Sequence, residues 1–117
     1  MAGMSNEDCL FCKIVAGDVP ADVVSTTDHV VAFRDINPQA PTHVLVIPRS
    51  HHANAAELAA AEPETVARLV DVAVEVAQAD GVEDYRMVFN TGPEVGQTVF
   101  HTHLHVLGGR SMSWPPG

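Results

Sequence analysis

The stretch His101-Thr102-His103-Leu104-His105-Val106-Leu107 alternates imidazole side chains with small or apolar ones near the C-terminus. Successive side chains of a β-strand point to opposite faces of a sheet. In an extended segment the three histidines therefore share one face, while Thr102, Leu104 and Val106 share the other. Imidazole is a nucleophile, an acid–base group and a metal ligand near neutral pH. The pattern predicts a β-strand over residues 99–107 that carries a functional site.

The remaining sequence has the periodicities of a small mixed domain. Apolar residues recur every three or four positions over residues 63–79, which predicts an amphipathic helix. Other expected elements are strands at 23–25, 29–33, 43–48 and 85–90, a helix at 9–16, and one or two helical turns within 53–61. Five strands and two clear helices without βαβ alternation predict an α+β fold with a mostly antiparallel sheet.

Length and composition indicate one globular domain. The chain has 117 residues, of which 46% are hydrophobic and 18% charged. It contains no apolar run as long as a membrane span, so we expect no association with a membrane. Residues 1–8 lack a basic segment and an apolar core, so we expect a flexible arm, no secretory signal and a cytoplasmic protein. The predicted domain covers residues 9–117.

The net charge of −9 limits the possible partners. A broad nucleic-acid interface needs many basic side chains to neutralise phosphates, and this chain has six basic against fifteen acidic residues. We therefore expect no nucleic-acid partner. A small phosphorylated ligand remains compatible with an acidic protein, because imidazoles and backbone amides can bind phosphate locally.

The two cysteines, Cys9 and Cys12, have C-x-x-C spacing. They are half of a metal site, a redox pair or two unrelated thiols. A redox C-x-x-C usually follows a strand, and none is predicted before Cys9, so the metal reading is favoured. Two thiolates and two imidazoles suit tetrahedral zinc. Candidates for the imidazoles are either His51 or His52, together with one histidine of the triad.

A glycine-containing loop precedes the histidine stretch. Gly96 permits close approach of backbone amides to a ligand, and Asn90, Gln97 and Thr98 supply side-chain donors. Beside a nucleophile, such a loop suits a phosphoryl group or an oxyanion. Glycine-containing turns are also common as simple connections between strands, so this signal is weak when taken alone.

Residues 96–110, with the ending Trp114-Pro115-Pro116-Gly117, resemble the histidine triad (HIT) family, and specifically its Hint branch. Residues 11–14, 33–43 and 85–88 are similar to it as well, so the resemblance spans nearly all of residues 9–117. It implies a HIT-like fold that dimerises into a continuous sheet. It also implies that the C-terminal tail of one copy reaches toward the active site of the other, where Trp114 serves as an anchor.

The same resemblance implies an activity. Family members hydrolyse purine nucleoside phosphoramidates or related mixed phosphates of AMP through a nucleotidyl-histidine intermediate. By match, His103 is the nucleophile, His105 donates to a phosphate oxygen, and His43 supports them through a buried relay. Thr98, where the family often has serine, lies near the leaving group. Asn90, Gly96 and Gln97 complete the phosphate cradle.

The resemblance also implies a nucleoside pocket, in which Asp35 accepts hydrogen bonds from the ribose hydroxyls. The expected lining of the base slot is Phe11, Ile14, Phe33, Ile36 and Leu45, for each of which core packing is an equal alternative. Some relatives keep a structural zinc, which by match is held here by Cys9, Cys12, His51 and His101, with His52 a rival of His51. No organic cofactor is expected.

Two alternatives remain open at this point. A dinucleoside polyphosphate hydrolase, as in the Fhit-like branch, is disfavoured by the Trp-Pro-Pro-Gly ending. A zinc-stabilised nucleotide-binding regulatory module is disfavoured by the intact triad and phosphate loop. Substrate comparison distinguishes the first, and a covalent nucleotide adduct distinguishes the second.

Overall fold

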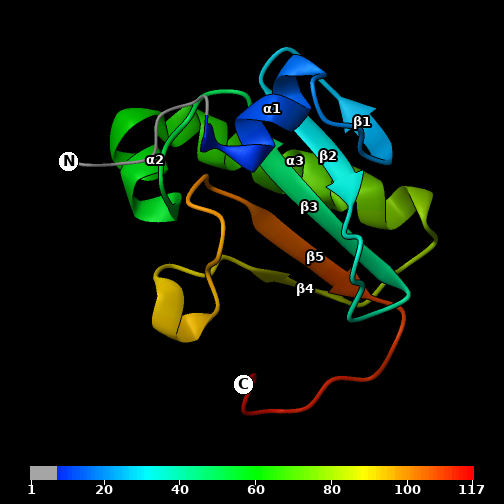
Figure 1. Cartoon of the computed structure of the whole chain (residues 1–117). Coiled ribbons are helices and arrows are strands. Elements are labelled where there is room, and N and C mark those ends of the chain that lie inside the picture. The colour runs from blue at the N-terminus through cyan, green and yellow to red at the C-terminus, as the bar shows by residue number, and fades with distance from the viewer. Residues whose placement is uncertain (1–7) are drawn as a thin grey trace.

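A computed structural model describes residues 8–117, so most of the expected flexible arm lies outside the described residues. Figure 1 shows a layered structure in which α3 lies behind the sheet and α1 in front of it. The elements are α1 (Leu10–Ala16), β1 (Val23–Thr26), β2 (Val30–Arg34), β3 (Thr42–Pro48), α2 (Ala55–Ala61), α3 (Pro63–Ala79), β4 (Tyr85–Val88), a short 3-10 helix (Pro93–Val95) and β5 (Leu104–Gly108).

The five strands form one open sheet in the order β1-β2-β3-β5-β4. All four neighbouring pairs are antiparallel, which confirms the predicted α+β class and sheet. β3 is central and buried along its whole length, because both faces of the sheet are covered there. Its register sets Leu45 opposite His105 and His43 opposite Leu107. Histidines from two strands therefore emerge on the same face.

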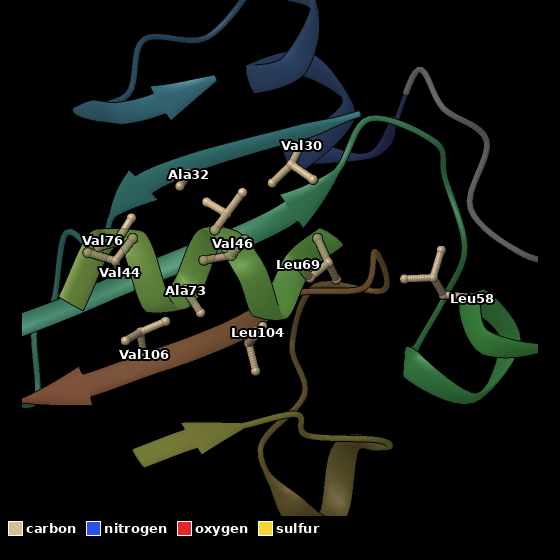
Figure 2. Packing of buried hydrophobic residues seen from close by; sticks show 11 residues of the cluster. Val30, Ala32, Val44, Val46, Leu58, Leu69, Ala73, Val76, Leu104 and Val106 are labelled. Carbon is tan, nitrogen blue, oxygen red and sulfur yellow. The ribbon is translucent and has the colours of Figure 1, made fainter. Parts of the chain in front are cut away.

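The face of the sheet behind the histidines packs against α3. Pro63 begins this helix, where its missing N–H costs nothing, and the apolar stripe that follows turns toward the sheet. Leu69 and Ala73 meet Val44 and Val106 in this cluster, which Figure 2 shows between the helix and the strands. Burying such side chains contributes roughly 1.5–3 kcal/mol each for the larger ones. This layer is the main core.

The opposite face carries a smaller cluster under α1. Phe11 from the helix packs with Phe33, Leu45 and Ile47 from β2 and β3. Cys9 caps the first turn of α1, where its Sγ accepts a hydrogen bond from the Cys12 backbone N–H at 3.3 Å. Because α1 has only seven residues, it covers one end of this face and leaves the histidines beside it.

The structure confirms one sequence expectation and corrects another. The helical turns expected within residues 53–61 form α2 over residues 55–61, which together with the two clear helices gives three α-helices in the described residues. Asn54 explains its start, because its side chain accepts the backbone N–H of Glu57. The histidine strand begins at Leu104 and not at residue 99. Residues 99–103 leave the sheet because Thr102 bonds to His52 instead of to a neighbouring strand.

Candidate functional site

His103 lies just before β5, on the face of the sheet that α1 partly covers. Its Nδ1 is 2.8 Å from the carbonyl oxygen of His101. A carbonyl only accepts, so Nδ1 carries the proton and donates it. In the neutral ring the lone pair is then on Nε2. The edge of Phe11 packs against the imidazole at a centroid distance of 5.0 Å, and the residue is 9% exposed. The ring is thus fixed in orientation and tautomer.

His43 and His105 form a hydrogen-bonded pair beside this imidazole. His43 Nε2 lies 2.9 Å from His105 Nδ1. The backbone N–H of Gln39 donates to His43 Nδ1 at 3.0 Å, so the proton of neutral His43 is on Nε2. That proton is donated to His105 Nδ1, and neutral His105 consequently carries its own proton on Nε2. The ring centroids of His103 and His105 are 5.0 Å apart. His105 therefore offers an N–H donor next to the lone pair of His103.

Asp35 follows β2 and completes this group. Its Oδ2 lies 3.4 Å from His43 Nε2, and its Oδ1 accepts the backbone N–H of Asn37 at 2.8 Å. Donor atoms of Asp35, His43 and His105 lie within 4.8 Å of one another, as in a metal site. The tautomer argues against a metal there, because the lone pair of His43 is turned to Gln39 and its Nε2 is protonated. The hydrogen bonds thus fix which ring nitrogen carries the proton in His43 and in His105, and we call Asp35, His43 and His105 the relay.

Burial sets the charge state of these imidazoles. It lowers the pKa of His43, against a smaller opposing effect of Asp35. It lowers the pKa of His103, and that of His105 to about 4, where the neighbouring histidines add to the effect. Since the charged form of a buried histidine is disfavoured, all three rings are neutral at pH 7. Neutral imidazole is the form that can act as a nucleophile.

The predicted phosphate-binding residues of the loop before the triad differ in exposure and in hydrogen bonding. Gly96 adopts φ +98°, which favours glycine, and Thr98 is exposed. Gln97 is buried, and its amide bonds to the Ala53 and Val99 carbonyls and to the Gly92 N–H. Both amide protons of Gln97 are used in this way. Its side chain holds the loop together and has no donor left for a phosphate, while Asn90 is half-buried at the start of the loop.

Of the predicted base-slot residues, four lie in or against one apolar cluster and one is exposed. Phe11, Phe33 and Leu45 are buried in the cluster under α1, and Ile14 packs against it. Ile36 is 99% exposed, outside this cluster. Trp114 in the tail is 82% exposed and packs against little of its own chain. The tail is tied back by Arg86, whose guanidinium donates to the Ser113 carbonyl at 3.1 Å.

A second cluster brings together Cys9, Cys12, His51 and His101, whose ligand atoms all lie within 4.8 Å of one another. His101 Nδ1 is 3.4 Å from each sulfur and 3.2 Å from His51 Nδ1. His51 Nδ1 is 3.2 Å from the Cys12 sulfur. Ligand atoms around tetrahedral zinc are about 3.3–3.8 Å apart, given bond lengths of about 2.0–2.3 Å. The donor set and its spacing fit such an ion.

The orientation of His101 supports the same fit. Its Nε2 lies 2.9 Å from the Pro48 carbonyl, so Nε2 carries the proton and the Nδ1 lone pair turns to the thiols. Burial lowers the pKa of His101 to about 4. Burial also raises the pKa of the Cys12 thiol to about 12, with a further contribution from Cys9. Neither cysteine forms a disulfide.

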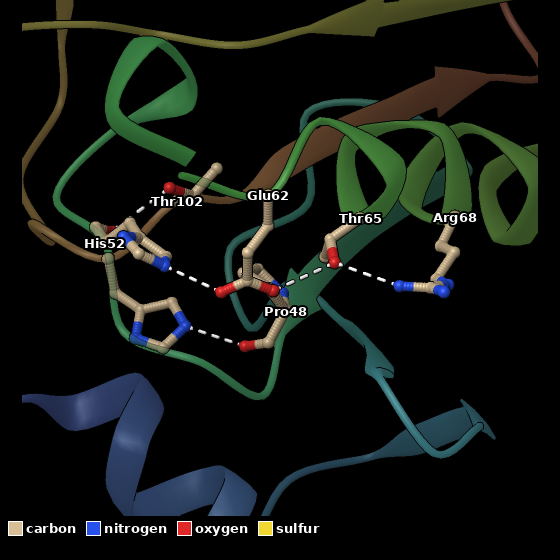
Figure 3. Close-up of polar contacts among 7 residues, drawn as sticks. Pro48, His52, Glu62, Thr65, Arg68 and Thr102 are labelled. Carbon is tan, nitrogen blue, oxygen red and sulfur yellow. Dashed lines mark hydrogen bonds and ion pairs between the residues drawn. The ribbon is translucent and has the colours of Figure 1, made fainter. Parts of the chain in front are cut away.

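His52, the alternative to His51, faces away from the thiols. Its Nε2 lies 2.8 Å from Glu62 Oε2 at the junction of α2 and α3, and Glu62 Oε1 accepts from the Thr65 hydroxyl. Figure 3 shows this network together with the contact to Thr102. The Thr102 backbone N–H and hydroxyl donate to the His52 carbonyl at 2.8 and 3.1 Å. Residues 51–52 are thereby fastened to the segment that carries His101 and His103.

Sequence reasoning missed the groups that orient these rings. They are the Gln39 N–H, the carbonyls of Pro48 and His101, and the network of Glu62. Three of the four are backbone atoms, and residue type gives no signal for a backbone atom. A separate groove of about 770 Å³ lies between residues 81–86 and 109–112, at the start of the tail and away from the histidines. Across residues 8–117, every helix is too short or too polar to cross a bilayer.

Comparison with known sequences finds one family model, described as HIT domain, that matches residues 16–112. A 14 kDa zinc-binding protein of Zea mays is 47% identical over 118 residues, covering 97% of this chain and 91% of the maize protein. The purine nucleoside phosphoramidase of Escherichia coli (strain K12) is 40% identical over 108 residues, covering 91% of each chain.

A solved structure gives the same relationship in three dimensions. The HIT family hydrolase from Legionella pneumophila Philadelphia 1 superposes with a TM-score of 0.89 at 49% sequence identity. The match covers 94% of this chain and 100% of that one. The histidines of both clusters lie within residues 16–112, which the family model matches, and Cys9 and Cys12 precede that range.

Proposed function

The chain belongs to the HIT domain family of hydrolases, and from that premise we propose that it cleaves purine nucleoside phosphoramidates or related AMP conjugates at the α-phosphorus. The observation that carries the proposal is the hydrogen bond from His103 Nδ1 to the His101 carbonyl. It leaves a lone pair on Nε2 of a ring that burial keeps neutral. The relative named purine nucleoside phosphoramidase supports the substrate class.

In the first step, His103 Nε2 attacks phosphorus, and the bond from phosphorus to the leaving nitrogen breaks. The electron pair of that bond stays on the nitrogen, which takes up one proton from solvent near the exposed Thr98. The Nε2–H of His105 donates to a phosphate oxygen and stabilises its charge as it develops. The product is an amine and a nucleotidyl-histidine, and His103 keeps its Nδ1 proton throughout.

In the second step, water attacks the same phosphorus and the bond to His103 Nε2 breaks. The electron pair returns to the imidazole, the water oxygen remains on phosphorus, and one proton goes to solvent. The nucleoside monophosphate then leaves. Two displacements at one phosphorus replace a single difficult one, which is the general advantage of covalent catalysis. Asp35 binds the ribose hydroxyls, and the cluster around Phe11, with Asn90 and Gly96 at the phosphate, surrounds the nucleotide.

Two further assignments belong to the same proposal. Zinc, held by Cys9, Cys12, His51 and His101, cross-links the first turn of α1 to the segment before β5 and stabilises the fold. The relative named as a zinc-binding protein supports this choice of metal. We also propose a cytoplasmic homodimer in which the edge strand β4 lies at the junction and Trp114 approaches the partner's site.

The test is a trapping experiment with an adenosine phosphoramidate. Wild-type protein, quenched in alkali, gains the mass of an adenylate on His103, and His103→Ala gains none and shows no turnover while still binding AMP. The matched control is His29→Ala, an exposed histidine outside both clusters, which keeps wild-type turnover. Retained turnover in His103→Ala refutes the mechanism. Faster cleavage of a diadenosine polyphosphate than of the phosphoramidate refutes the substrate class.

A further inference from the structure

A line of three hydrogen bonds runs from the start of the C-terminal tail into the catalytic histidines. Arg110 Nε donates to the Gln39 carbonyl at 2.8 Å. The Gln39 N–H donates to His43 Nδ1 at 3.0 Å, and His43 Nε2 lies 2.9 Å from His105 Nδ1. Arg110 follows β5 directly, and Gln39 lies in the loop between β2 and β3. The residue that begins the tail therefore holds the carbonyl side of Gln39, one peptide group away from the N–H that bonds His43.

The tautomer of His43 decides what His105 presents to a substrate. With the Gln39 N–H on Nδ1, His43 donates through Nε2 and His105 carries its proton on Nε2. If the Gln39 N–H turned away, His43 could hold its proton on Nδ1 and accept from His105 Nδ1 instead. His105 would then direct a lone pair, rather than an N–H, at an anionic phosphate oxygen. A neutral imidazole has no strong preference between these forms without a partner.

The loop that carries Gln39 is exposed and depends on few outside contacts. Within the loop, the Gln39 side chain donates to the Asn37 carbonyl at 3.0 Å. Outside it, the Gln39 N–H donates to His43, and the Gln39 carbonyl, which belongs to the next peptide group, accepts from Arg110. The guanidinium is itself fixed, since its Nη1 donates to the Ser111 carbonyl at 3.0 Å. A charged donor strengthens a hydrogen bond to a carbonyl.

Packing brings the same two segments together independently of these hydrogen bonds. A Cβ on Gly109 would lie 3.0 Å from Pro41 Cβ, so the chain after β5 touches the loop next to Arg110. Gly109 adopts φ +90°, which favours glycine and directs the chain out of the strand. The backbone itself therefore places Arg110 close to Gln39, so their contact does not depend only on the reach of a long flexible side chain.

We propose that Arg110 is a positioning residue that holds the main chain at Gln39 so that His43 and His105 keep their Nε2–H tautomers. The tautomer is a property of the protein alone. Its effect on turnover rests on the function proposed above, in which His105 donates to the phosphate. The two levels are measured separately, so failure of one is distinguishable from failure of the other.

The experiment compares Arg110→Ala with Arg86→Ala, a matched loss of an arginine that also holds the tail. Nitrogen–proton correlation spectra of ¹⁵N-histidine protein at pH 7.5 report which ring nitrogen carries each proton. Wild type and Arg86→Ala are expected to show His43 and His105 as Nε2–H. Arg110→Ala is expected to show mixed tautomers, with kcat on an adenosine phosphoramidate lower by about tenfold and AMP affinity within twofold of wild type.

Unchanged tautomers in Arg110→Ala overturn the proposal, as do mixed tautomers of equal extent in Arg86→Ala, which would assign the effect to the tail as a whole. If the alanine variant does not fold, Arg110→Lys replaces it, because lysine keeps the charge but loses the planar guanidinium. Its histidine tautomers and kcat are measured and interpreted in the same way. If wild type lacks phosphoramidate turnover, the proposed function fails, and the spectra still decide the role of Arg110. Mixed tautomers with unchanged kcat overturn the catalytic part.

Discussion

The carbonyl oxygen of His101 accepts the Nδ1 proton of His103 at 2.8 Å, while the ring of His101 faces Cys9 and Cys12. One residue thus belongs to both clusters, through its side chain in one and its backbone in the other. The two clusters share the backbone of His101, so a displacement of that backbone alters both the ring that faces the thiols and the carbonyl that orients His103. The Thr102 contacts with His52 strengthen this coupling.

We expect the metal cluster to distinguish His51 from His52. His51→Ala removes a ligand, so zinc content should fall from about one to below about 0.1 per chain and the melting temperature should fall by several degrees. His52→Ala leaves all four ligand atoms and should retain the metal. Elemental analysis of untagged protein measures both, and the charge-transfer band of a Co²⁺-substituted sample reports thiolate ligation. Retained metal in His51→Ala with loss in His52→Ala contradicts the ligand set.

Asp80 should stabilise the fold through Arg34 and Thr42. Arg34 makes two 2.9 Å bonds to this carboxylate and the Thr42 hydroxyl a third, at 2.8 Å, joining the end of α3 to β2 and β3. We expect Asp80→Asn to lower the free energy of unfolding by about 1–2 kcal/mol at pH 7. Urea denaturation measures this, and the exposed Asp71→Asn on the same helix should change it by less than about 0.5 kcal/mol.

The same carboxylate gives an acid dependence. The hydrogen bonds of Arg34, then of Thr42, lower the pKa of Asp80 from 3.8 to about 2. A depressed folded-state pKa contributes stability that is complete above the unfolded value and is lost as pH falls between the two. The stability difference between wild type and Asp80→Asn should therefore shrink as the pH falls from about 4 to 2. A constant difference over this window would show that the carboxylate charge is not the cause.

Burial of neutral His105 should produce a second acid dependence at higher pH. Its pKa falls from 6.5 to about 4, first through burial and then through His103 and His43. The unfolded chain binds this proton more readily, so the stabilising contribution is complete above pH 6.5 and is lost as pH falls toward 4. Wild type should lose about 1–2 kcal/mol more than His105→Gln between pH 7 and 5 in denaturant titrations. Parallel curves for the two chains would contradict this, and metal loss common to both cancels in the difference.

Periodicity predicted the parts of the fold that depend on burial. The alternation at residues 103–106 correctly separated the histidine face from Leu104 and Val106, which lie in the main core. The stripe of α3 was equally readable, because one face of that helix repeats over four turns. The start of β5 was not, since it depends on Thr102 bonding to His52, fifty residues away. Sequence shows which face is apolar but not where a tertiary contact ends a strand.

Residue type singled out the imidazoles that the structure gathers into two clusters, but not the groups that orient them. Cys9 and His101 are ninety-two positions apart and were brought together by family resemblance, and their ligand atoms do lie together in the structure. Gln97 was expected at the phosphate because it carries donors, yet the fold uses those donors internally. Ile36 is apolar and fully exposed. In each case the sequence shows the chemical character of the side chain, but the group that it contacts is set by the tertiary fold.

Gly108 should be needed for the close packing of the end of β5. It pairs with Thr42 and Tyr85, and a Cβ built on it would lie 2.5 Å from Val82 Cγ1 and 3.2 Å from both the Asp84 carbonyl and Tyr85 Cβ. Gly108→Ala should therefore lower the free energy of unfolding by about 1–3 kcal/mol, as overpacking does elsewhere. Because the closest atom belongs to a side chain, Gly108→Ala/Val82→Ala should recover more than half of that loss relative to Val82→Ala alone. Additive losses in urea titrations would show that the backbone contact, and not the valine, sets the limit.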